Sequence, residues 1–309
     1  MGEETAIGWT DATMNFWIGC GEVGPGCDGC YAHALVTNRL RSAVGDVWGL
    51  GKERYRTMER NWKKPAGWNA YRELGFTEMR AGGRSVKVPL WVFALSLGDF
   101  FDNDVPDEWR EDAWQVIRKT PLLRWQLVTK RLPNVGKMLP QDWNFGENYR
   151  HVGIIASVVT QKEYDRDIVR VTLLKDAGIK WIGLSIEPQL EMINLMSERG
   201  KLAGIETRLD WVIGGGESVQ SHHQARMYDL DWGLSLIAQC GLYNIPYFQK
   251  QVGSNAFFRG ERFTTNQRAG TEPGEWPEEL RVQMMPRVYD QQGAMDGKRD
   301  EGNAQKGNP

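Results

Sequence analysis

The sequence predicts an α/β fold, and within that class a partial or full (β/α) barrel with parallel strands. Short apolar segments alternate with helical segments along most of the chain, which is the pattern of βαβ units. Polar side chains follow several of the apolar segments, as they do where parallel strands end at a functional site. The length of 309 residues is within the range of a single barrel. A doubly wound sheet is the alternative arrangement.

The expected elements follow one another in a regular order after residue 87. Strands are expected at 88–96, 124–129, 151–158, 179–187, 210–215 and 245–250. Helices are expected at 107–119, after Pro106, at 161–177, and at 228–241, where Gly241 is a plausible C-cap.

Two regions depart from this order. Residues 44–86 interrupt the alternation, and we interpret about 44–86 as an insertion into a barrel that spans 1–252. The C-terminal extension 253–309 is rich in Gly, Pro, Gln and charged residues, and we expect 290–309 to be disordered.

Composition limits the classes of protein to consider. The net charge of −2 gives no overall positive field, so any nucleic-acid site has to be local. The N-terminus is polar and lacks the apolar region of a signal peptide, and no run of apolar residues is long enough to span a membrane. A cytoplasmic location without membrane partners is expected, and there clustered cysteines indicate metal binding or catalysis rather than disulfides.

Three of the four cysteines lie close together in one glycine-rich segment. Cys20, Cys27 and Cys30 have the spacing C-x6-C-x2-C, and a helix from Tyr31 to Arg41 is expected to follow them. Three thiolates leave one iron of a [4Fe–4S] cluster without a protein ligand. That iron can chelate S-adenosylmethionine, whose reduction by the cluster yields a carbon radical.

Other readings of the cysteines remain open. His33 could complete a Cys3His zinc site, as in a nucleic-acid-binding protein without catalysis. The thiols could also be buried and carry no metal, and Cys240 is expected to be a core residue on a helix. The four His do not form a convincing Ser–His–Asp set, since His222 and His223 are adjacent in a polar loop.

The cysteine segment resembles the cluster loop of the radical S-adenosylmethionine superfamily, especially the branch related to spore photoproduct lyase. The matching residues are Asn15–Cys20 and Gly26–Ala32, although Phe16 replaces a proline and the first two cysteines are further apart than in that branch. The resemblance implies a barrel of the radical S-adenosylmethionine type, a [4Fe–4S] cluster, S-adenosyl-L-methionine and a 5′-deoxyadenosyl radical. It also implies an external electron donor of the flavodoxin or ferredoxin type, and isomerase or lyase chemistry.

A second resemblance covers roughly 5–251. The chain is similar to a family of phage and prophage proteins of unknown function, which implies the cytoplasm of a host cell. The stretches that carry it are 8–13, 26–32, 96–102, 128–131, 184–188, 210–218 and 246–250.

Polar residues at the expected strand ends are candidates for binding and catalysis, because strand ends of parallel sheets meet at one edge. By analogy with the superfamily, the cofactor-binding candidates are Ser96, Asp99, Ser157, Gly214, Gly215 and Gly216. The substrate-side, catalytic candidates are Lys130, Glu187, Glu217 and Lys250. As alternatives, Asp99 and Glu187 could cap helices, and Lys130 with Arg131 could be a solvated pair.

A nucleic-acid base, in DNA, is the predicted substrate. The reactions considered are isomerisation of a modified thymine and reversal of a lesion, and a peptide or free nucleoside is the alternative substrate. The stretch 48–71 supports DNA because it interleaves basic and aromatic side chains, although it could equally be an amphipathic helix on the barrel. These residues are Lys52, Arg54, Arg56, Arg60, Lys63 and Lys64, with Trp48, Tyr55, Trp62 and Trp68. A barrel that keeps the cluster but has lost turnover is a further alternative.

Overall fold

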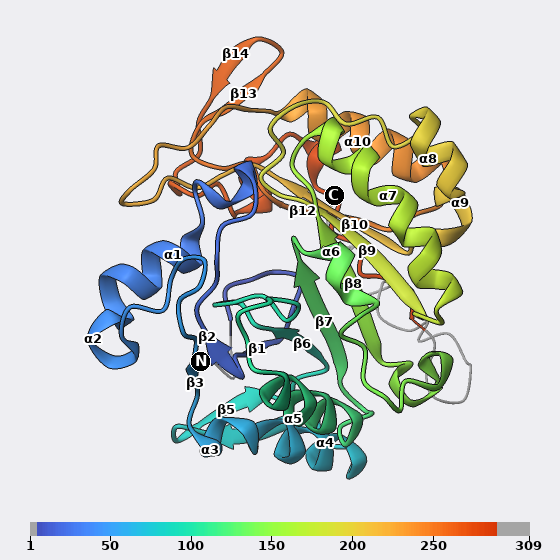
Figure 1. Ribbon diagram of the computed structural model, residues 1–309. Coiled ribbons are helices and arrows are strands. Elements are labelled where there is room, and N and C mark those ends of the chain that lie inside the picture. Colours follow the sequence, from blue (N-terminus) through green and yellow to red (C-terminus); the bar gives the residue numbers. More distant parts are fainter. Residues whose placement is uncertain (1–4, 289–309) are drawn as a thin grey trace.

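The computed structural model describes residues 5–288 and shows an α/β fold around one curled parallel sheet (Figure 1). The sheet has seven strands in the order β1-β6-β7-β8-β9-β10-β12, all paired in parallel. Its strands are β1 (Ala12–Met14), β6 (Trp91–Ala94), β7 (Arg124–Thr129), β8 (Val152–Ser157), β9 (Trp181–Ile186), β10 (Trp211–Gly215) and β12 (Tyr247–Gln251). The barrel is therefore partial, with β1 and β12 at its open edges.

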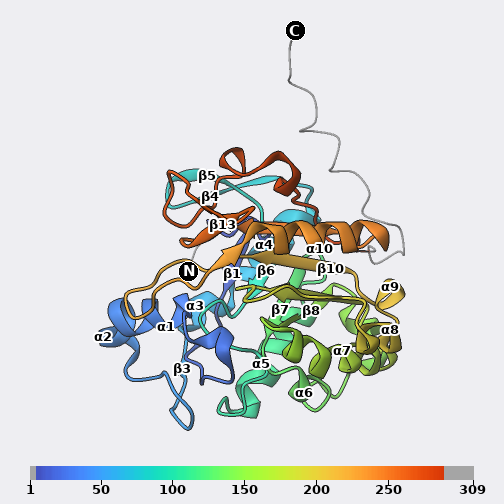
Figure 2. The same cartoon turned by 90° about the horizontal axis from the view of Figure 1, so that it is seen from above.

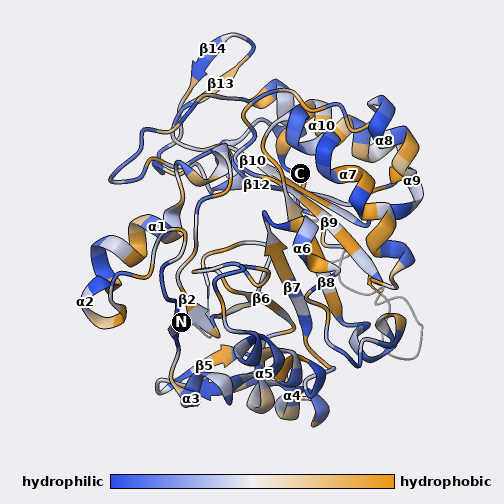
Figure 3. Cartoon of the chain, in the orientation of Figure 1, coloured by the Kyte–Doolittle hydropathy of each residue, from blue (hydrophilic) through white to orange (hydrophobic). Residues whose placement is uncertain are grey.

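Helices connect successive strands and cover the outside of the sheet (Figure 2). They are α5 (Asp107–Arg118), α6 (Leu132–Val135), α7 (Gln161–Asp176), α8 (Glu198–Ala203), α9 (Ile205–Arg208) and α10 (Leu230–Leu242). Every residue of β8 and β9 is buried, as expected for strands with both faces covered. Apolar positions dominate these strands when residues are coloured by hydropathy (Figure 3). Thr160 caps α7 by accepting a hydrogen bond from the Glu163 amide, 3.3 Å away.

The long connection from β1 to β6 contains the cysteine loop and the predicted insertion. The loop follows β2 (Trp17–Ile18) and includes a 3-10 turn, Pro25–Cys27. The helix predicted from Tyr31 to Arg41 is α1 (Tyr31–Leu35), a π-helical turn over Val36–Leu40 and α2 (Arg41–Val44). The rest comprises β3 (Tyr55–Arg56), α3 (Glu59–Trp62), α4 (Lys64–Glu73), β4 (Glu78–Ala81) and β5 (Arg84–Lys87).

The segment after β12 packs against the barrel as far as it is described. Its strands β13 (Ala256–Phe258) and β14 (Glu261–Phe263) form a small sheet with β11 (Tyr228–Asp229), which precedes α10, and two 3-10 turns follow, Pro273–Glu275 and Glu278–Leu280. The Met284 amide then donates to the Tyr247 carbonyl at 2.8 Å and the Gln249 amide donates to the Val282 carbonyl at 2.7 Å, which attaches residues 282–284 to the open edge of the sheet. The predicted disorder of 290–309 lies outside the described residues.

A second apolar core fills part of the space beneath the strand ends. Its buried members are Trp9, Phe93, Ile155, Trp181, Trp211, Ile213, Phe248 and Val288. Trp9 and Phe93 also line the main pocket, so this cluster is the floor of that pocket. Within the described residues, no helix is both long and apolar enough to cross a bilayer.

Candidate metal and cofactor site

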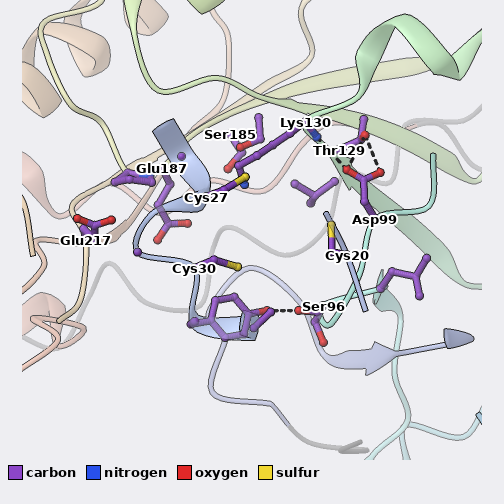
Figure 4. A pocket seen from close by; sticks show the side chains of 18 of the residues that line it. Cys20, Cys27, Cys30, Ser96, Asp99, Thr129, Lys130, Ser185, Glu187 and Glu217 are labelled. Carbon is purple, nitrogen blue, oxygen red and sulfur yellow. Dashed lines mark hydrogen bonds between the residues drawn. The ribbon is translucent and has the colours of Figure 1, made fainter. Parts of the chain in front are cut away.

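The main pocket opens at the carboxyl ends of the parallel strands (Figure 4). It brings together residues that are up to 244 positions apart, from Ile7 to Gln251. Of the predicted site residues, those lining the pocket are Cys20, Cys27, Cys30, Ser96, Asp99, Lys130, Ser157, Glu187, Gly216, Glu217 and Lys250. The strand-end pattern therefore predicted which distant residues lie in one cavity.

The three cysteines lie on one tight loop and their sulfur atoms face the same space (Figure 4). Each is partly accessible, and local hydrogen bonds fix the backbone: the Cys27 amide donates to the Gly24 carbonyl at 2.9 Å, and the Cys30 amide donates to the Cys27 carbonyl at 3.2 Å. Gly29 has no room for a side chain, because a Cβ there would lie 2.1 Å from Glu217 Oε1. The loop packs closely while leaving the thiols open to the pocket.

The three thiols on one loop match in number the thiolates of a [4Fe–4S] cluster with one open iron, whereas His33, the fourth ligand of the zinc alternative, lies outside the pocket. His33 does not line the pocket; its ring stacks on Trp48 at 5.2 Å and lies 4.9 Å from His222. Cys240 is buried on α10, away from the pocket. Within 5–288, no group of three or more His, Cys, Asp and Glu side chains converges on one point as a single-ion site requires. In a [4Fe–4S] cluster each thiolate binds a different iron, so such convergence is not needed.

Arg131 is the cation closest to the cysteine loop. Its Nη1 donates to Cys20 Sγ at 3.3 Å, and its Nη2 donates to the Gly21 carbonyl at 2.7 Å. The guanidinium is only 7% exposed and is held by Asp99 at 3.2 Å and by Asp102 at 3.6 Å. The alternative of a solvated pair at 130–131 is wrong for Arg131, which is a buried part of the site.

Asp99 holds Arg131 in place, and its carboxylate is bound on several sides by hydrogen bonds. Its carboxylate accepts hydrogen bonds from the Thr129 hydroxyl at 2.8 Å, the Lys130 amide at 3.1 Å and the Phe101 amide at 2.9 Å, besides the Arg131 contact. These contacts use most of its acceptor positions. Asp99, which was predicted as a cofactor-binding residue, thus lines the pocket and fixes the position of Arg131.

A chain of buried charges continues from Arg131 to the insertion. Asp102 also pairs with Arg54, whose side chain is fully buried and 2.9 Å away. Arg54 donates in addition to the Val47, Gly49 and Lys52 carbonyls, and the Gly49 amide donates to the Cys20 carbonyl at 2.8 Å. Arg54 thus braces the loop behind Cys20, and the prediction that it belongs to a nucleic-acid surface is wrong.

The rest of the predicted 48–71 surface is also dispersed. Trp62 and Trp68 are buried in the main core and cannot stack on bases. Arg56 lies over the Trp62 ring at 3.9 Å and pairs with Asp112 at 2.7 Å, on a groove separate from the cysteine pocket. The amphipathic-helix alternative describes α4 better, since Pro65 and Trp68 face the core.

Lys130 faces the thiols from the opposite wall of the pocket (Figure 4). Burial lowers the pKa of Lys130, but the charges of Cys27, Cys30, Cys20 and Asp99 outweigh burial, and the net pKa is raised. Lys130 therefore stays cationic at neutral pH. Burial raises the pKa of the Cys20 thiol to about 12, against the charge of Arg131. Binding of a metal at Cys20 would release the thiol proton.

Glu217 clamps the cysteine loop from the side of β10. Arg226 donates three hydrogen bonds to its carboxylate, two from the guanidinium at 2.7 and 3.0 Å and one from the backbone amide at 2.9 Å, and His223 Nε2 lies 3.1 Å from it. Burial would raise the pKa of Glu217, but the hydrogen bonds and charge of Arg226 lower it overall, so the group is ionised. Arg226 also donates to the Pro25 carbonyl at 2.9 Å and to Asp28 at 3.0 Å. Glu217 thus acts through Arg226 on the loop.

Glu187 and Lys250 form an ion pair on the same pocket, with Lys250 Nζ 2.5 Å from Glu187 Oε1. Both side chains are partly exposed to the cavity, at 13% and 22%. Ser157 and Ser185 supply hydroxyl groups nearby on the pocket wall. The pair is suited to hold a polar group of a substrate or to pass a proton to it.

Gly216 is the one predicted glycine of 214–216 that lines the pocket. Packing explains the other two: a Cβ on Gly214 would lie 2.2 Å from the Tyr247 hydroxyl, and one on Gly215 would lie 2.8 Å from the Gln251 carbonyl. Their side-chain space is occupied by β12 rather than by a ligand.

Several pocket residues were not singled out from the sequence. Trp9 lines the pocket, and so does Trp48, which was predicted only as part of the 48–71 stretch; in the described part of the chain their buried indole N–H groups have no acceptor. Ser185 could have been found as an inward position of the strand 179–187. No sequence signal marked Arg226, because its partners Glu217 and Asp28 lie on other segments.

A family model described as "Protein of unknown function (DUF5131)" matches residues 4–300, which is nearly the whole chain. No curated protein and no solved structure matches the chain.

Proposed function

We propose that this chain, which belongs to the DUF5131 family, is a radical S-adenosylmethionine enzyme that acts on a nucleic-acid base. The observation that carries the proposal is the set of three accessible thiols on one loop, facing a pocket at the carboxyl ends of a parallel partial barrel. Cys20, Cys27 and Cys30 would hold a [4Fe–4S] cluster. When bound, the cluster would reduce S-adenosyl-L-methionine and so supply a 5′-deoxyadenosyl radical.

The charges around the thiols support a bound anionic group. Lys130 and Arg131 place two cations against the three sulfurs, and Arg131 is fixed by Asp99 and Asp102. Such fixed donors and charges orient ligands and stabilise the charge of a cluster. The floor of Trp9, Phe93 and Val128 keeps the cavity apolar and limits access of water from below.

Cofactor and substrate would occupy different parts of the pocket. Ser96, Ser157 and Gly216 line it and stay the cofactor-side candidates, and the rings of Trp9 and Trp48 line the same pocket. The Glu187–Lys250 ion pair is the substrate-side candidate, since it is the charged pair in the cavity whose two members are both partly exposed.

Two resemblances support a nucleic-acid substrate: one to the branch that contains a DNA-lesion lyase, and one to phage proteins. The third support, the 48–71 surface, is lost, because Arg54, Trp62 and Trp68 are buried. A base in a duplex would have to be unstacked at a cost of a few kcal/mol before it reached the cavity.

Cofactor cleavage is the direct test of the proposal. Reduced protein supplied with S-adenosylmethionine is expected to release 5′-deoxyadenosine and methionine, detected by liquid chromatography. Ser157→Ala should slow this release without loss of iron, whereas Ser85→Ala, on the distant β5 strand, should not. Transfer of deuterium from a labelled oligonucleotide into 5′-deoxyadenosine would identify the substrate. S-adenosylhomocysteine as the sole product would instead indicate methyl transfer and exclude the radical mechanism.

A further inference from the structure

The hairpin of β13 and β14 follows directly after the strand that carries Lys250 and Gln251. In its register Ala256 pairs with Phe263, Phe257 with Arg262, and Phe258 with Glu261. Directly paired residues lie on the same face of a hairpin, and neighbours along a strand alternate. One face therefore carries Ala256, Phe258, Glu261 and Phe263, and the other carries Phe257 and Arg262.

The two faces have different surroundings. Ala256 is buried, and Phe258 and Phe263 pack on the apolar cluster that contains Tyr228, Trp276 and Leu280. Phe257 does not belong to that cluster and is half-exposed, and Arg262, across from it, is exposed. The hairpin thus presents an aromatic ring and a cation side by side on its outer face.

Arginines outnumber acids in the hairpin segment, although the chain as a whole is negative. Residues 254–268 hold three arginines, Arg259, Arg262 and Arg268, and one acid, Glu261. Glu261 lies on the packed face, where Arg259 also lies over the Phe258 ring at 4.7 Å. In the adjoining loop, Glu272 and Glu275 accept hydrogen bonds from Gln267 and Asn266. Among the described residues, no carboxylate pairs with Arg262 or Arg268. Arg259 reaches Glu279 only at 3.9 Å and is 71% exposed. The Asp229 carboxylate, beside Phe257 in β11, already caps α10.

Hydrogen bonds join the base of the hairpin to the pocket. The Ser254 amide donates to the Glu217 carbonyl at 2.9 Å, and the Ser254 hydroxyl donates to the Arg268 carbonyl at 2.6 Å. The Asn255 side chain donates to the Ala225 carbonyl at 3.1 Å, next to the Arg226 that holds the cysteine loop. A chain lying along the hairpin would therefore pass close to the mouth of the cysteine pocket.

We infer that the outer face of the β13–β14 hairpin binds a single strand of nucleic acid, with Phe257 stacking on a base and Arg262 and Arg268 contacting phosphates. A regular polyanion with flat rings matches an aromatic ring that has an unpaired cation directly beside it. An acidic peptide would use the arginines but not the ring. The inference rests on the proposed function in one respect: the bound strand would supply the base on which the enzyme acts in the pocket.

Fluorescence anisotropy of a labelled oligothymidylate of about 20 nucleotides tests this binding on the full chain as isolated, without cofactor. Phe257→Ala is expected to raise Kd about five- to a hundred-fold and to leave the salt dependence unchanged. Arg262→Gln with Arg268→Gln is expected to raise Kd at least about ten-fold and to reduce the slope of log K against log[salt] by about 1.4, as for two lost phosphate contacts.

The matched control is Arg80→Gln with Arg84→Gln, two arginines on the β4–β5 hairpin at the opposite end of the molecule (Figure 1). The Kd of this control variant should stay within about two-fold of the parent value. Melting temperatures verify that all variants fold. Equal losses in both arginine pairs, an unchanged Kd in Phe257→Ala, or polyglutamate competing as well as the oligonucleotide would each overturn the inference. A protein that binds as expected but neither holds iron nor cleaves S-adenosylmethionine would overturn the proposed function alone.

Discussion

Arg131 shows how one buried side chain can govern the chemistry of its neighbour. It donates to Cys20 Sγ while two carboxylates fix its position, so the positive charge beside this sulfur is permanent. Hydrogen bonds and positive charge near cluster sulfurs favour the reduced, more negative state. Arg131 is therefore expected to raise the reduction potential of a bound cluster.

Replacing Arg131 by Met should lower the midpoint potential of the reconstituted protein by roughly 50 mV, as for a lost charge-assisted hydrogen bond of about 1–2 kcal/mol. Arg131→Lys should give a smaller shift because the charge is retained. Potentiometric titration followed by EPR measures both, and Arg150→Gln, on an exposed arginine paired with Glu147, serves as the control. Equal potentials in all four proteins would show that Arg131 has only a structural role.

The sequence predicted residues whose signal is local and missed those whose partners are distant. The spacing of Cys20, Cys27 and Cys30 is visible in eleven residues, and strand ends pointed to Lys130, Glu187 and Lys250. Burial of Arg54 depends on Asp102, 48 positions away, and the clamp of Glu217 depends on Arg226 and a loop near residue 25. No pattern in a single sequence encodes such pairings.

At the scale of elements, His151 links helix α5 to the start of strand β8. Its Nε2 contacts the Ile117 carbonyl at 2.9 Å in a buried setting. Burial lowers the pKa of His151 to about 4, although the Ile117 carbonyl opposes this shift. The unfolded chain takes up a proton at this residue near pH 6.5, whereas the folded chain does so only near pH 4. The contribution of neutral His151 to the free energy of unfolding is therefore fully present above pH 6.5 and is lost as the pH falls toward 4.

His151→Gln should remove this part of the acid sensitivity. Between pH 7 and pH 4.5 the parent is expected to lose about 2–3 kcal/mol more unfolding free energy than the variant, as for a two-unit difference in pH. Urea unfolding at the two pH values measures the difference. Identical pH dependence of parent and variant would mean that His151 is not the group responsible.

Regular elements were the most predictable part of the fold. The predicted strand 124–129 matches β7, and the helices at 107–119 and 161–177 match α5 and α7 to within a residue or two. Periodicity is strong in these buried or amphipathic segments. The interior of 44–86 was not predicted from the sequence. β3 depends on distant pairing with β2, whereas β4 and β5 form a local hairpin around Gly82–Gly83, whose Gly-Gly turn was a signal that the sequence analysis missed.

At the scale of the whole molecule, the partial barrel leaves an open edge at β12 that the C-terminal extension covers. Residues 282–284 pair with β12, and the Trp211 indole donates to the Met284 carbonyl at 2.8 Å. The extension predicted from residue 253 is thus, as far as 288, an integral part of the barrel. Its closing role could not be predicted, because the segment lacks the apolar run of an ordinary strand.

The same architecture places the groups that carry the proposals at one end of the sheet. The thiols, the Lys130 and Arg131 cations, the Glu187–Lys250 pair and the β13–β14 hairpin all follow carboxyl ends of strands or contact loops that do. In parallel α/β proteins this end is where ligands bind. A common site is therefore a simpler explanation of these features than several independent ones.

Iron content after anaerobic reconstitution tests the central claim most directly. We predict a brown protein with about four irons per chain and, after reduction, an EPR signal that S-adenosylmethionine alters. Cys27→Ala should lose the iron, whereas His33→Ala, a matched change just outside the pocket, should keep it. A colourless protein that binds one zinc ion, and that loses it equally in Cys27→Ala and His33→Ala, would contradict the account.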